Sequence, residues 1–421
     1  MSAPSRAGAA APGGAATRVD AVLPGGVATG GLSGPDLGAF NIADLRERAR
    51  RRLPRALFEY LDRGTEDEFA LRNNVEALRR LRLRPRVLVD VSARSQAVTL
   101  FGRAQPSPLL IGPTGVADLL WHGGELALAR AAAAAGIPFT LATSSTTAME
   151  AVAAVPGGTT WLQLYLWEDR ALSFQLLDRA AACGVAALVL TADTPVMANR
   201  EFNDRNGFRN PFRLNARVAA DLMRHPRWLF GVMGRYLAAG GMPQFVNYPA
   251  ELRGTVTGGP RRQANSASVC WDDLGRLRDR WRGPLIVKGI LCAEDALLAA
   301  ARGADAVVVS NHGGRNLDGT EAPITVLPEV VAAVGGRLTV LFDSGVRRGS
   351  DVVKAMALGA QGVLLGRATL YGLAAAGEPG VRRALALLQA EIDRSLAMLG
   401  RTDLSQLDAG LLRPAPPDAD G

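Results

Sequence analysis

The stretch Ser310–Arg315 holds the residue types best suited to catalysis in this sequence. Its His312 is one of only three histidines, and the neighbouring glycines let a ligand approach closely. Asp193, at the end of an earlier apolar run, could hydrogen-bond the imidazole and stabilise its protonated form. Arg315 could bind a carboxylate. These residue types predict general-base catalysis by His312.

Two clusters of glycine and arginine follow, at Asp343–Arg348 and at Gly366-Arg367. In α/β barrels, the loops after the last two strands commonly form a phosphate site from backbone N–H and guanidinium groups. Buried arginines without an anion would be costly, so we expect Arg347 and Arg367 to bind phosphate, whereas Arg348 suits the surface. The pattern predicts a phosphorylated cofactor.

Lys288 is one of two lysines in a chain whose other basic residues are arginines. Its compact ammonium suits a localised negative charge in the site, and the alternative is a buried structural pair with Asp305 or Asp343. We interpret His122 and His225 as structural. The histidines are too few and too far apart to indicate a metal site.

Eight short aliphatic runs alternate with segments of helical pattern, which suits parallel strands buried on both faces. Eight such units predict an α/β fold, a single (β/α)8 TIM barrel whose active site lies at the carboxyl ends of the strands. Gln163 and Tyr165 end one run two residues apart, as do Thr191 and Asp193, so each pair shares one face. The runs are Leu109–Ile111, Phe139–Ala142, Trp161–Leu166, Ala187–Asp193, Leu285–Lys288, Ala306–Ser310, Leu338–Phe342 and Gly362–Leu365.

The segments before and after the barrel have their own patterns. Residues 1–40, rich in Ala, Gly and Pro, predict a disordered arm. Apolar spacing from Ile42 to Leu83 predicts a helical lead-in, interrupted at Pro54, before the barrel domain of residues 41–404. A helix from Val381 to Leu399 would complete the outer ring, and residues 405–421 would form a tail.

About ninety residues separate the fourth and fifth runs, far more than one crossover needs, so we expect an insertion at about 200–265 on the active-site face. It interleaves arginine with large apolar residues. A lid packed on the barrel or on a neighbouring subunit is one interpretation, and a surface that contacts an anionic membrane is the other. The apolar residues are Trp228, Leu229, Phe230, Val232, Met233, Tyr236 and Leu237.

Composition excludes several classes of protein. With 48% hydrophobic and 21% charged residues, the chain is globular, and its 48 basic residues are scattered rather than gathered into a nucleic-acid-binding stripe. Three cysteines without CxxC spacing argue against disulfides and structural zinc. We expect no signal peptide and no membrane-spanning helix, and a cytoplasmic location that includes the inner face of the membrane.

Ser310–Asp318 resembles the signature of the FMN-dependent α-hydroxy acid oxidases and dehydrogenases, which include glycolate oxidase and the lactate and mandelate dehydrogenases. The resemblance covers about residues 41–404. Further matching motifs follow the family's order: Leu53-Pro54, Arg84-Pro85-Arg86, Pro113-Thr114-Gly115, Gln163-Leu164-Tyr165, Thr191–Pro195, Arg200-Glu201, Lys288-Gly289 and Asp343–Gly349.

The resemblance implies a role for each site residue. His312 would be the catalytic base and Asp193 its partner. The substrate would be bound by Tyr60, Tyr165, Arg200 and Arg315. Lys288 would face the N1–C2=O edge of the flavin and Asp343 its ribityl chain. The residues that bind FMN would be Pro113, Thr114, Gly115, Gln163, Thr191, Lys288, Asp343, Gly345, Arg347, Gly366 and Arg367.

The implied reaction is oxidation of an (S)-2-hydroxy acid to the 2-oxo acid, by hydride transfer or through a carbanion. Gly115 and Ser144 are smaller than the residues common in short-chain oxidases, which favours a bulky, mandelate-like substrate, with lactate the other candidate. The motifs His225–Trp228 and Gly241–Gln244 in the insertion are similar to the membrane-associated members and favour a quinone-type acceptor. The family suggests a homotetramer.

Three other functions are open. One is a soluble oxidase that uses oxygen and produces hydrogen peroxide. Another, among the wider phosphate-binding barrels, is an isomerase or nucleotide dehydrogenase, which would leave Tyr60, Tyr165, Arg200 and Arg315 unexplained as a set. The last is a non-enzymatic basic membrane-binding protein, which would leave the polar and charged residues after the predicted strands unexplained.

Overall fold

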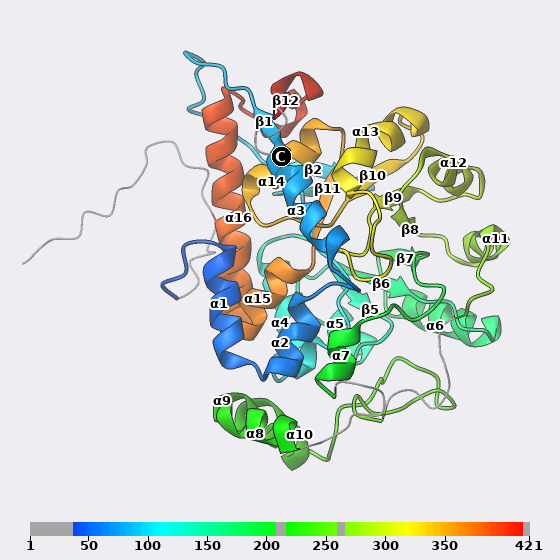
Figure 1. The fold of residues 1–421 in the computed structure, drawn as a ribbon. Coiled ribbons are helices and arrows are strands. Elements are labelled where there is room, and N and C mark those ends of the chain that lie inside the picture. Colours follow the sequence, from blue (N-terminus) through cyan, green and yellow to red (C-terminus); the bar gives the residue numbers. More distant parts are fainter. Residues whose placement is uncertain (1–36, 208–215, 259–265, 416–421) are drawn as a thin grey trace, which may run out of the picture.

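A closed barrel of eight parallel strands forms the centre of the molecule in the computed structural model, which describes residues 37–207, 216–258 and 266–415 (Figure 1). All eight predicted runs form strands, with ends shifted by at most two residues, and this confirms the (β/α)8 fold. In barrel order the strands are β4 (Leu109–Ile111), β5 (Phe139–Ala142), β6 (Thr160–Leu164), β7 (Ala187–Thr191), β8 (Leu285–Ile290), β9 (Ala306–Val309), β10 (Thr339–Phe342) and β11 (Gly362–Leu365), and β11 pairs with β4.

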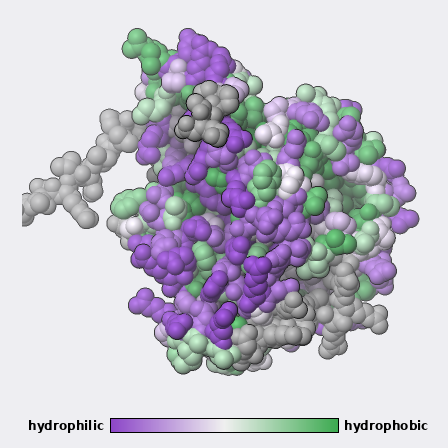
Figure 2. Space-filling view, in the orientation of Figure 1, coloured by the Kyte–Doolittle hydropathy of each residue, from purple (hydrophilic) through white to green (hydrophobic). Residues whose placement is uncertain are grey.

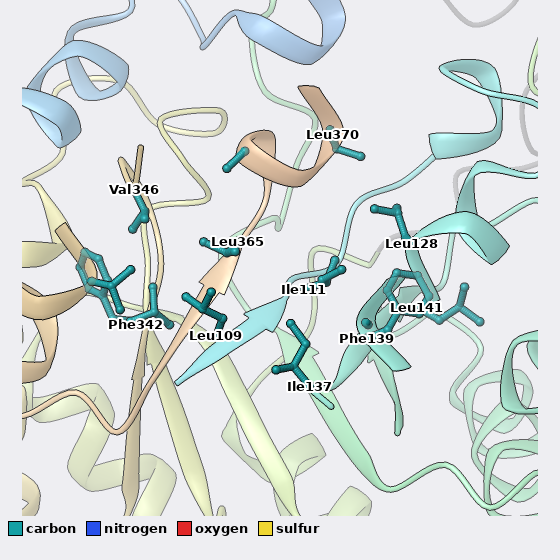
Figure 3. Packing of buried hydrophobic residues seen from close by; sticks show 14 of the residues in the cluster. Leu109, Ile111, Leu128, Ile137, Phe139, Leu141, Phe342, Val346, Leu365 and Leu370 are labelled. Carbon is teal, nitrogen blue, oxygen red and sulfur yellow. The ribbon is translucent and has the colours of Figure 1, made fainter. Parts of the chain in front are cut away.

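Helices surround this barrel and give it an outer apolar layer. Leu109 and Ile111 of β4 pack in that outer layer (Figure 3), while Leu110 between them belongs to a separate cluster inside the barrel, as the two-residue period of a strand requires. The helices are α4 (Gly124–Ala134), α5 (Met149–Ala153), α6 (Arg170–Ala182), α11 (Trp271–Arg280), α12 (Ala293–Ala301), α13 (Pro323–Val334), α14 (Gly349–Ala357), α15 (Arg367–Ala376) and α16 (Glu378–Leu399).

A hairpin closes the amino-terminal end of the barrel. It is formed by β2 (Val98–Leu100) and β3 (Arg103–Gln105). Leu100 joins the interior cluster, and the ring of Phe101 lies 5.8 Å from that of Trp161 near the start of β6. A ligand site is therefore left to the opposite end, where the strands' carboxyl ends lie.

The lead-in consists of α1 (Ile42–Arg52), α2 (Arg55–Asp62) and α3 (Phe69–Arg80), with Pro54 between the first two helices. The helical prediction is wrong for its last residues, because β1 (Leu81–Leu83) pairs with β12 (Leu412–Pro414) instead.

Two short 3₁₀ helices, η3 (Leu404–Gln406) and η4 (Ala409–Leu411), precede β12 in the predicted tail. At the other terminus, residues 1–36 of the predicted arm lie outside the described residues. Ala39 is buried, and its carbonyl accepts hydrogen bonds from Arg383 of α16.

The insertion leaves the carboxyl end of β7 and forms a group of short helices at the lower edge of Figure 1. Trp228 and Val232 face inward and are buried, whereas Phe230 and Leu237 are 72% and 57% exposed. No described helix is long and apolar enough to cross a membrane. The helices at the lower edge are α8 (Ala216–Arg224), α9 (Pro226–Trp228), the π-helix η2 (Leu229–Gly234) and α10 (Arg235–Ala238), whereas α7 (Glu201–Arg205) contacts α2 above them.

Candidate active site

A cavity opens at the carboxyl ends of the barrel strands, and α2 of the lead-in covers one side of it. Sixteen of the seventeen predicted site residues line this cavity, and Asp193 lies behind His312. The cavity residues that the sequence prediction did not name include Ser344, which lies inside the predicted phosphate motif, and Leu61, which follows Tyr60. Because each of them lies next to predicted site residues in the sequence, that position could have identified both as cavity residues.

His312 and Asp193 form the predicted pair, with 2.9 Å between the imidazole Nδ1 and the carboxylate Oδ1. His312 has φ +56°, in the left-handed region, and its backbone N–H donates to Ser310 Oγ at 3.0 Å. Gly289 makes the pair possible, because a Cβ at that position would lie 2.6 Å from Asp193 Cβ. The glycine after Lys288 therefore makes room for the His312–Asp193 pair, a role that the sequence prediction missed.

Burial lowers the pKa of His312 below its ordinary value, although Asp193 acts in the opposite direction. Burial alone would raise the pKa of Asp193, but its interactions with His312, which include a hydrogen bond, and the charge of Lys288 outweigh burial and hold this pKa low. The pair therefore holds a neutral imidazole against an ionised carboxylate at neutral pH, as a general base requires. Asp193 Oδ2 is buried without a hydrogen-bond partner among the described residues.

Lys288 lies buried between two neighbouring strand ends. Its Nζ is 2.9 Å from Asp343 Oδ2 and 2.7 Å from Ser310 Oγ. Burial lowers the pKa of Lys288, but Asp343 and Asp193 more than compensate and raise it, so the ammonium stays charged. The structural pair with Asp343 that the sequence left open is present, and Lys288 also lines the cavity.

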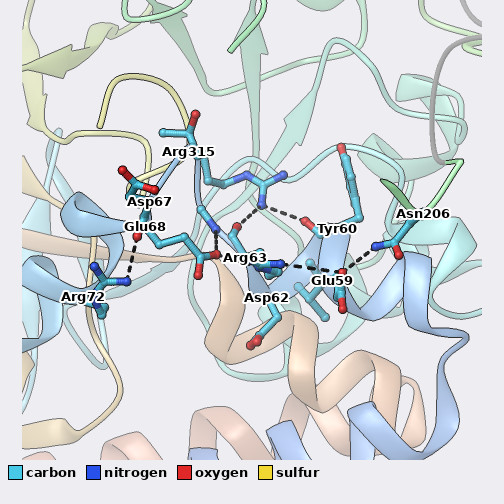
Figure 4. Close-up of polar contacts among 12 residues, drawn as sticks. Glu59, Tyr60, Asp62, Arg63, Asp67, Glu68, Arg72, Asn206 and Arg315 are labelled. Atoms are coloured by element: carbon cyan, nitrogen blue, oxygen red, sulfur yellow. Dashed lines mark hydrogen bonds and ion pairs between the residues drawn. The ribbon is translucent and has the colours of Figure 1, made fainter. Parts of the chain in front are cut away.

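Four arginines lining the cavity make it a site for anions. Arg315 donates to the carbonyls of Tyr60 and Arg63 at 2.8 and 3.1 Å (Figure 4), and its guanidinium lies 5.1 Å from the Tyr60 ring centroid. Arg367 donates to the carbonyls of Leu61, Arg63 and Gly313. The remaining two are Arg200 and Arg347.

Within the described part of the chain, these guanidinium groups form no ion pair with a carboxylate. Burial and the charges of Arg200 and Arg367 lower the pKa of Arg315 to about 9, and burial lowers that of Arg367 to about 10. Among the described residues, neither guanidinium has a carboxylate within 4.0 Å. Clustered, partly desolvated cations require an anion to neutralise them.

The cavity also fits a cofactor with a phosphate and a polar ring system. Thr114 Oγ1 is buried without a partner in the described chain, so it is available to a bound group. Gln163 Nε2 donates to Thr191 Oγ1 at 3.0 Å, which fixes the amide at the cavity wall. Gly366 is the N-cap of α15, and the first N–H groups of this helix together with Arg367 suit phosphate.

The proposed substrate side of the cavity is lined by small residues. A Cβ at Gly115 would lie 2.7 Å from Ser144 Oγ, so these two positions share one space. Tyr165 lies nearby in the lining, and burial raises the pKa of its hydroxyl, which stays protonated and can donate.

The lead-in holds the loop after β9, which carries His312, through contacts that the sequence prediction missed. Asn74 of α3 and Asn311 exchange side-chain hydrogen bonds at 2.8 and 2.7 Å, and both residues are buried. Asp318, the last residue of the signature, accepts from the N–H groups of Phe69 and Ala70 at the start of α3. Part of the motif is therefore structural, and only the fold shows which part.

Comparison with known proteins gives consistent matches over this region. The family model described as FMN-dependent dehydrogenase matches residues 49–414. (S)-Mandelate dehydrogenase from Pseudomonas putida is 44% identical over 376 residues, covering 89% of this chain and 94% of the relative. An L-lactate dehydrogenase from Caulobacter sp. (strain K31) is also 44% identical, covering 88% of this chain and 97% of the relative.

Two solved structures are similar over the same part of the chain. The crystal structure of the monotopic membrane protein (S)-mandelate dehydrogenase aligns with a TM-score of 0.84 at 44% identity, covering 89% of this chain and 99% of the other. A mandelate oxidase crystallised with 3,3-difluoro-2-hydroxy-3-phenylpropionic acid aligns with a TM-score of 0.74 at 36% identity, covering 89% and 98%.

Proposed function

Because this chain belongs to the FMN-dependent dehydrogenase family, we propose that it oxidises an (S)-2-hydroxy acid, bulky and mandelate-like or else lactate, to the 2-oxo acid. The observation that carries the proposal is the His312–Asp193 pair in a cavity that also holds unneutralised guanidinium groups. A base beside an anion site suits a substrate with a hydroxyl next to a carboxylate.

His312 is the proposed catalytic base. Its Nδ1 faces Asp193, which leaves Nε2 to take the hydroxyl proton of the substrate. Asp193 stabilises the imidazolium that results. FMN, when bound, would accept the α-hydrogen of the substrate together with its two electrons, as a hydride.

Arg315 and Arg200 are the proposed ligands of the substrate carboxylate. The backbone carbonyls of Tyr60 and Arg63 fix the Arg315 guanidinium, and Arg200 Nε donates to the Arg315 carbonyl at 3.0 Å. The hydroxyls of Tyr60 and Tyr165 would complete the set. Two guanidinium groups and two phenols hold a small anion in one orientation.

The residues proposed to hold FMN fall into two groups. Lys288, Gln163 and Thr191, with Pro113, Thr114 and Gly115, would meet the ring system, where the Lys288 ammonium stabilises negative charge. Asp343 would meet the ribityl chain. The phosphate would be bound by Gly345, Arg347, Gly366 and Arg367.

An anaerobic reduction screen tests the activity. The purified flavoprotein is mixed with mandelate, lactate, 4-hydroxymandelate or longer 2-hydroxy acids, and flavin absorbance is followed in the absence of oxygen. We expect rapid bleaching by at least one of these acids. A preparation that contains FMN but is not reduced by any of them would contradict the proposed function.

For the electron acceptor we propose a membrane quinone, with the protein at the inner face of the membrane as a peripheral homotetramer. The support is that outward-facing Phe230 and Leu237 lie beside arginines, a composition that suits an anionic bilayer. Oxygen is the second candidate, because a mandelate oxidase is also similar in structure. Reoxidation rates with oxygen and with a quinone analogue separate the two acceptors.

Vesicle flotation tests the membrane contact. Phe230→Ser/Leu237→Ser removes outward-facing apolar surface without touching the core, and we expect it to weaken flotation with anionic vesicles. Met398→Ser on α16 is the matched control, because Met398 is 70% exposed and distant in sequence from the insertion. If both variants float like the parent, the apolar side chains do not contact the membrane.

A further inference from the structure

A second basic site lies outside the active site, in a groove between α1 and the insertion helices α8 and α9. We call it the arginine groove. Five of its lining residues are arginines and two are carboxylates, which gives a formal charge of +3 with His225 neutral. The lining residues are Gly38, Asp44, Glu47, Arg48, Arg51, Arg52, Arg224, His225, Pro226, Arg227 and Ala375.

The two carboxylates of the groove are already engaged. Glu47 accepts from Arg50 and Arg51 of its own helix, and Asp44 accepts the N–H of Phe40 at 2.7 Å. Three other arginines of the groove have no carboxylate within 4.0 Å in the described chain: Arg48, Arg224 and Arg227. The groove therefore has a surplus of guanidinium groups that the described residues do not neutralise.

Arg52 forms the floor of the groove. Its guanidinium stacks on the Trp121 ring at 3.8 Å and donates to the Ala374 carbonyl at 3.0 Å. Burial and the nearby charge of Arg227 lower the pKa of Arg52 to about 10. A half-buried cation facing a second cation is an unfavourable arrangement that an anion between them would relieve.

The surface beside the groove is apolar. Met223 immediately precedes Arg224 and is 71% exposed, and Phe230 follows Arg227 by three residues and is 72% exposed. At the lower edge of Figure 2, where these helices lie, hydrophobic surface adjoins hydrophilic surface. Apolar side chains that enter a bilayer would place the groove at the level of the lipid headgroups.

We propose that the arginine groove binds the phosphate of an anionic phospholipid headgroup, held between Arg48 of α1 and Arg227 of α9. A guanidinium group can donate two parallel hydrogen bonds to a pair of phosphate oxygens. Two arginines, one from each helix, therefore form a defined binding site and not only a region of positive charge. This inference rests on the membrane contact proposed above and adds a defined lipid site to it.

Charge-conserving variants test the site in the full-length, FMN-loaded protein. Arg48→Lys/Arg227→Lys keeps the net charge but removes the guanidinium forks. Arg217→Lys/Arg235→Lys changes two exposed arginines of the same insertion that do not line the groove. Flotation is measured with phosphatidylcholine vesicles and with vesicles that also contain phosphatidylglycerol.

We expect the groove variant to lose about tenfold in affinity for the phosphatidylglycerol vesicles, and the control variant to stay within about twofold of the parent. Equal binding by the parent and the groove variant would show a diffuse charge effect and overturn the site. Release of the parent by millimolar inorganic phosphate, at an ionic strength matched with chloride, would overturn the assignment to lipid in favour of free phosphate.

The same preparations separate this inference from the proposed activity. A parent that floats with neither vesicle overturns both the membrane contact and the groove, whatever its activity. Failure of mandelate and the other acids to reduce the flavin refutes the proposed reaction but leaves the vesicle result standing. Arg48→Lys/Arg227→Lys is expected to keep the parent's rate of flavin reduction, because neither residue lines the active-site cavity.

Discussion

The loop after β9 and the insertion after β7 leave the same end of the barrel, but different kinds of contact attach them to the rest of the molecule. The β9 loop is tied to α3 by the buried Asn74–Asn311 pair and by Asp318. The insertion helices rest on the barrel through Trp228 Nε1, which donates to the Leu119 carbonyl at 2.7 Å, and through the Tyr236 hydroxyl, which accepts from Gly123 N–H.

This difference separates two tasks. Proton transfer requires atoms held within fractions of an ångström, and buried hydrogen bonds from several elements provide that precision around His312. Contact with a variable partner such as a lipid surface requires exposed apolar and basic groups on a less constrained support. The comparison predicts large catalytic effects from changes in the first region and small ones from changes in the second.

The largest effect is expected for His312→Ala. FMN should remain bound, whereas flavin reduction by substrate should fall by about 10²–10⁴-fold, because no other group in the pair can accept the hydroxyl proton. Stopped-flow reduction under anaerobic conditions measures the rate, and flavin absorbance controls for cofactor content. Reduction near the parent rate would remove His312 from the mechanism.

Arg315→Lys should reduce kcat/KM by about 10–100-fold, because an ammonium cannot reproduce a guanidinium that bonds two carbonyls and grips a carboxylate. Arg348→Lys is the matched control. Arg348 is exposed and pairs with Glu391 at 2.7 Å, so its kinetics should stay within about twofold of the parent. Similar losses in both variants would contradict the carboxylate assignment.

The pH dependence follows from the direction of the His312 shift. Burial places its pKa below the ordinary 6.5, so the imidazole is neutral at pH 7 and gains a proton only as the pH falls through that lower value. Flavin reduction should therefore be level near neutrality and fall about tenfold per pH unit in acid. An inflection above 6.5 would show that the imidazole is charged in the resting protein.

The same contrast explains what the sequence could predict. The barrel puts the carboxyl ends of all its strands at one face, so the residue types after the strands were enough to predict that His312, Asp193, Arg315, Arg347 and Arg367 meet. Tyr60 and Arg200 were predicted only from the family resemblance. Contacts set by distant segments were not accessible. Neither the pairing of β1 with β12 nor the need for a glycine at Gly289 leaves a local pattern.

In the insertion, the sequence shows which residue types are present but does not predict which side chains face the barrel and which face outward. Alternation of arginine with large apolar residues is compatible with a lid and with a membrane surface. In the structure one part of this set packs inward and another faces outward, as Trp228 and Phe230 do. The sequence could not tell the inward-facing apolar residues from the outward-facing ones. These helices are short, and their inner face is fixed by contacts with residues about a hundred positions earlier.

Ser144→Trp should shift substrate preference by about tenfold from mandelate toward glycolate, because the indole would fill the space that Gly115 and Ser144 leave open. The ratio of kcat/KM for the two acids measures it. If the unmutated protein already has a higher kcat/KM for glycolate than for mandelate, the proposal that Gly115 and Ser144 leave space for a bulky substrate is wrong.

Trp228→Phe probes one of the contact routes between the insertion and the loop after β5, which carries Ser144. Leu119, whose carbonyl Trp228 binds, follows Asp118, and Asp118 accepts from Thr146 Oγ1 at 2.6 Å in the loop that places Ser144 in the cavity. Phenylalanine keeps most of the buried ring but loses the hydrogen bond. We expect a loss of about 1 kcal/mol in unfolding free energy.

Catalysis in Trp228→Phe should change by less than about threefold in kcat/KM with a soluble dye as acceptor, because a single lost hydrogen bond leaves Asp118 and its partners in place. Trp281→Phe is the matched control, since Trp281 Nε1 donates to the Pro284 carbonyl at 3.0 Å, between α11 and β8. Equal destabilisation of both variants, with flavin reduction unchanged, would show that the Trp228–Leu119 hydrogen bond does not position the loop after β5. A selective tenfold loss in Trp228→Phe would instead show that the docked insertion helices position this loop through Leu119, Asp118 and Thr146.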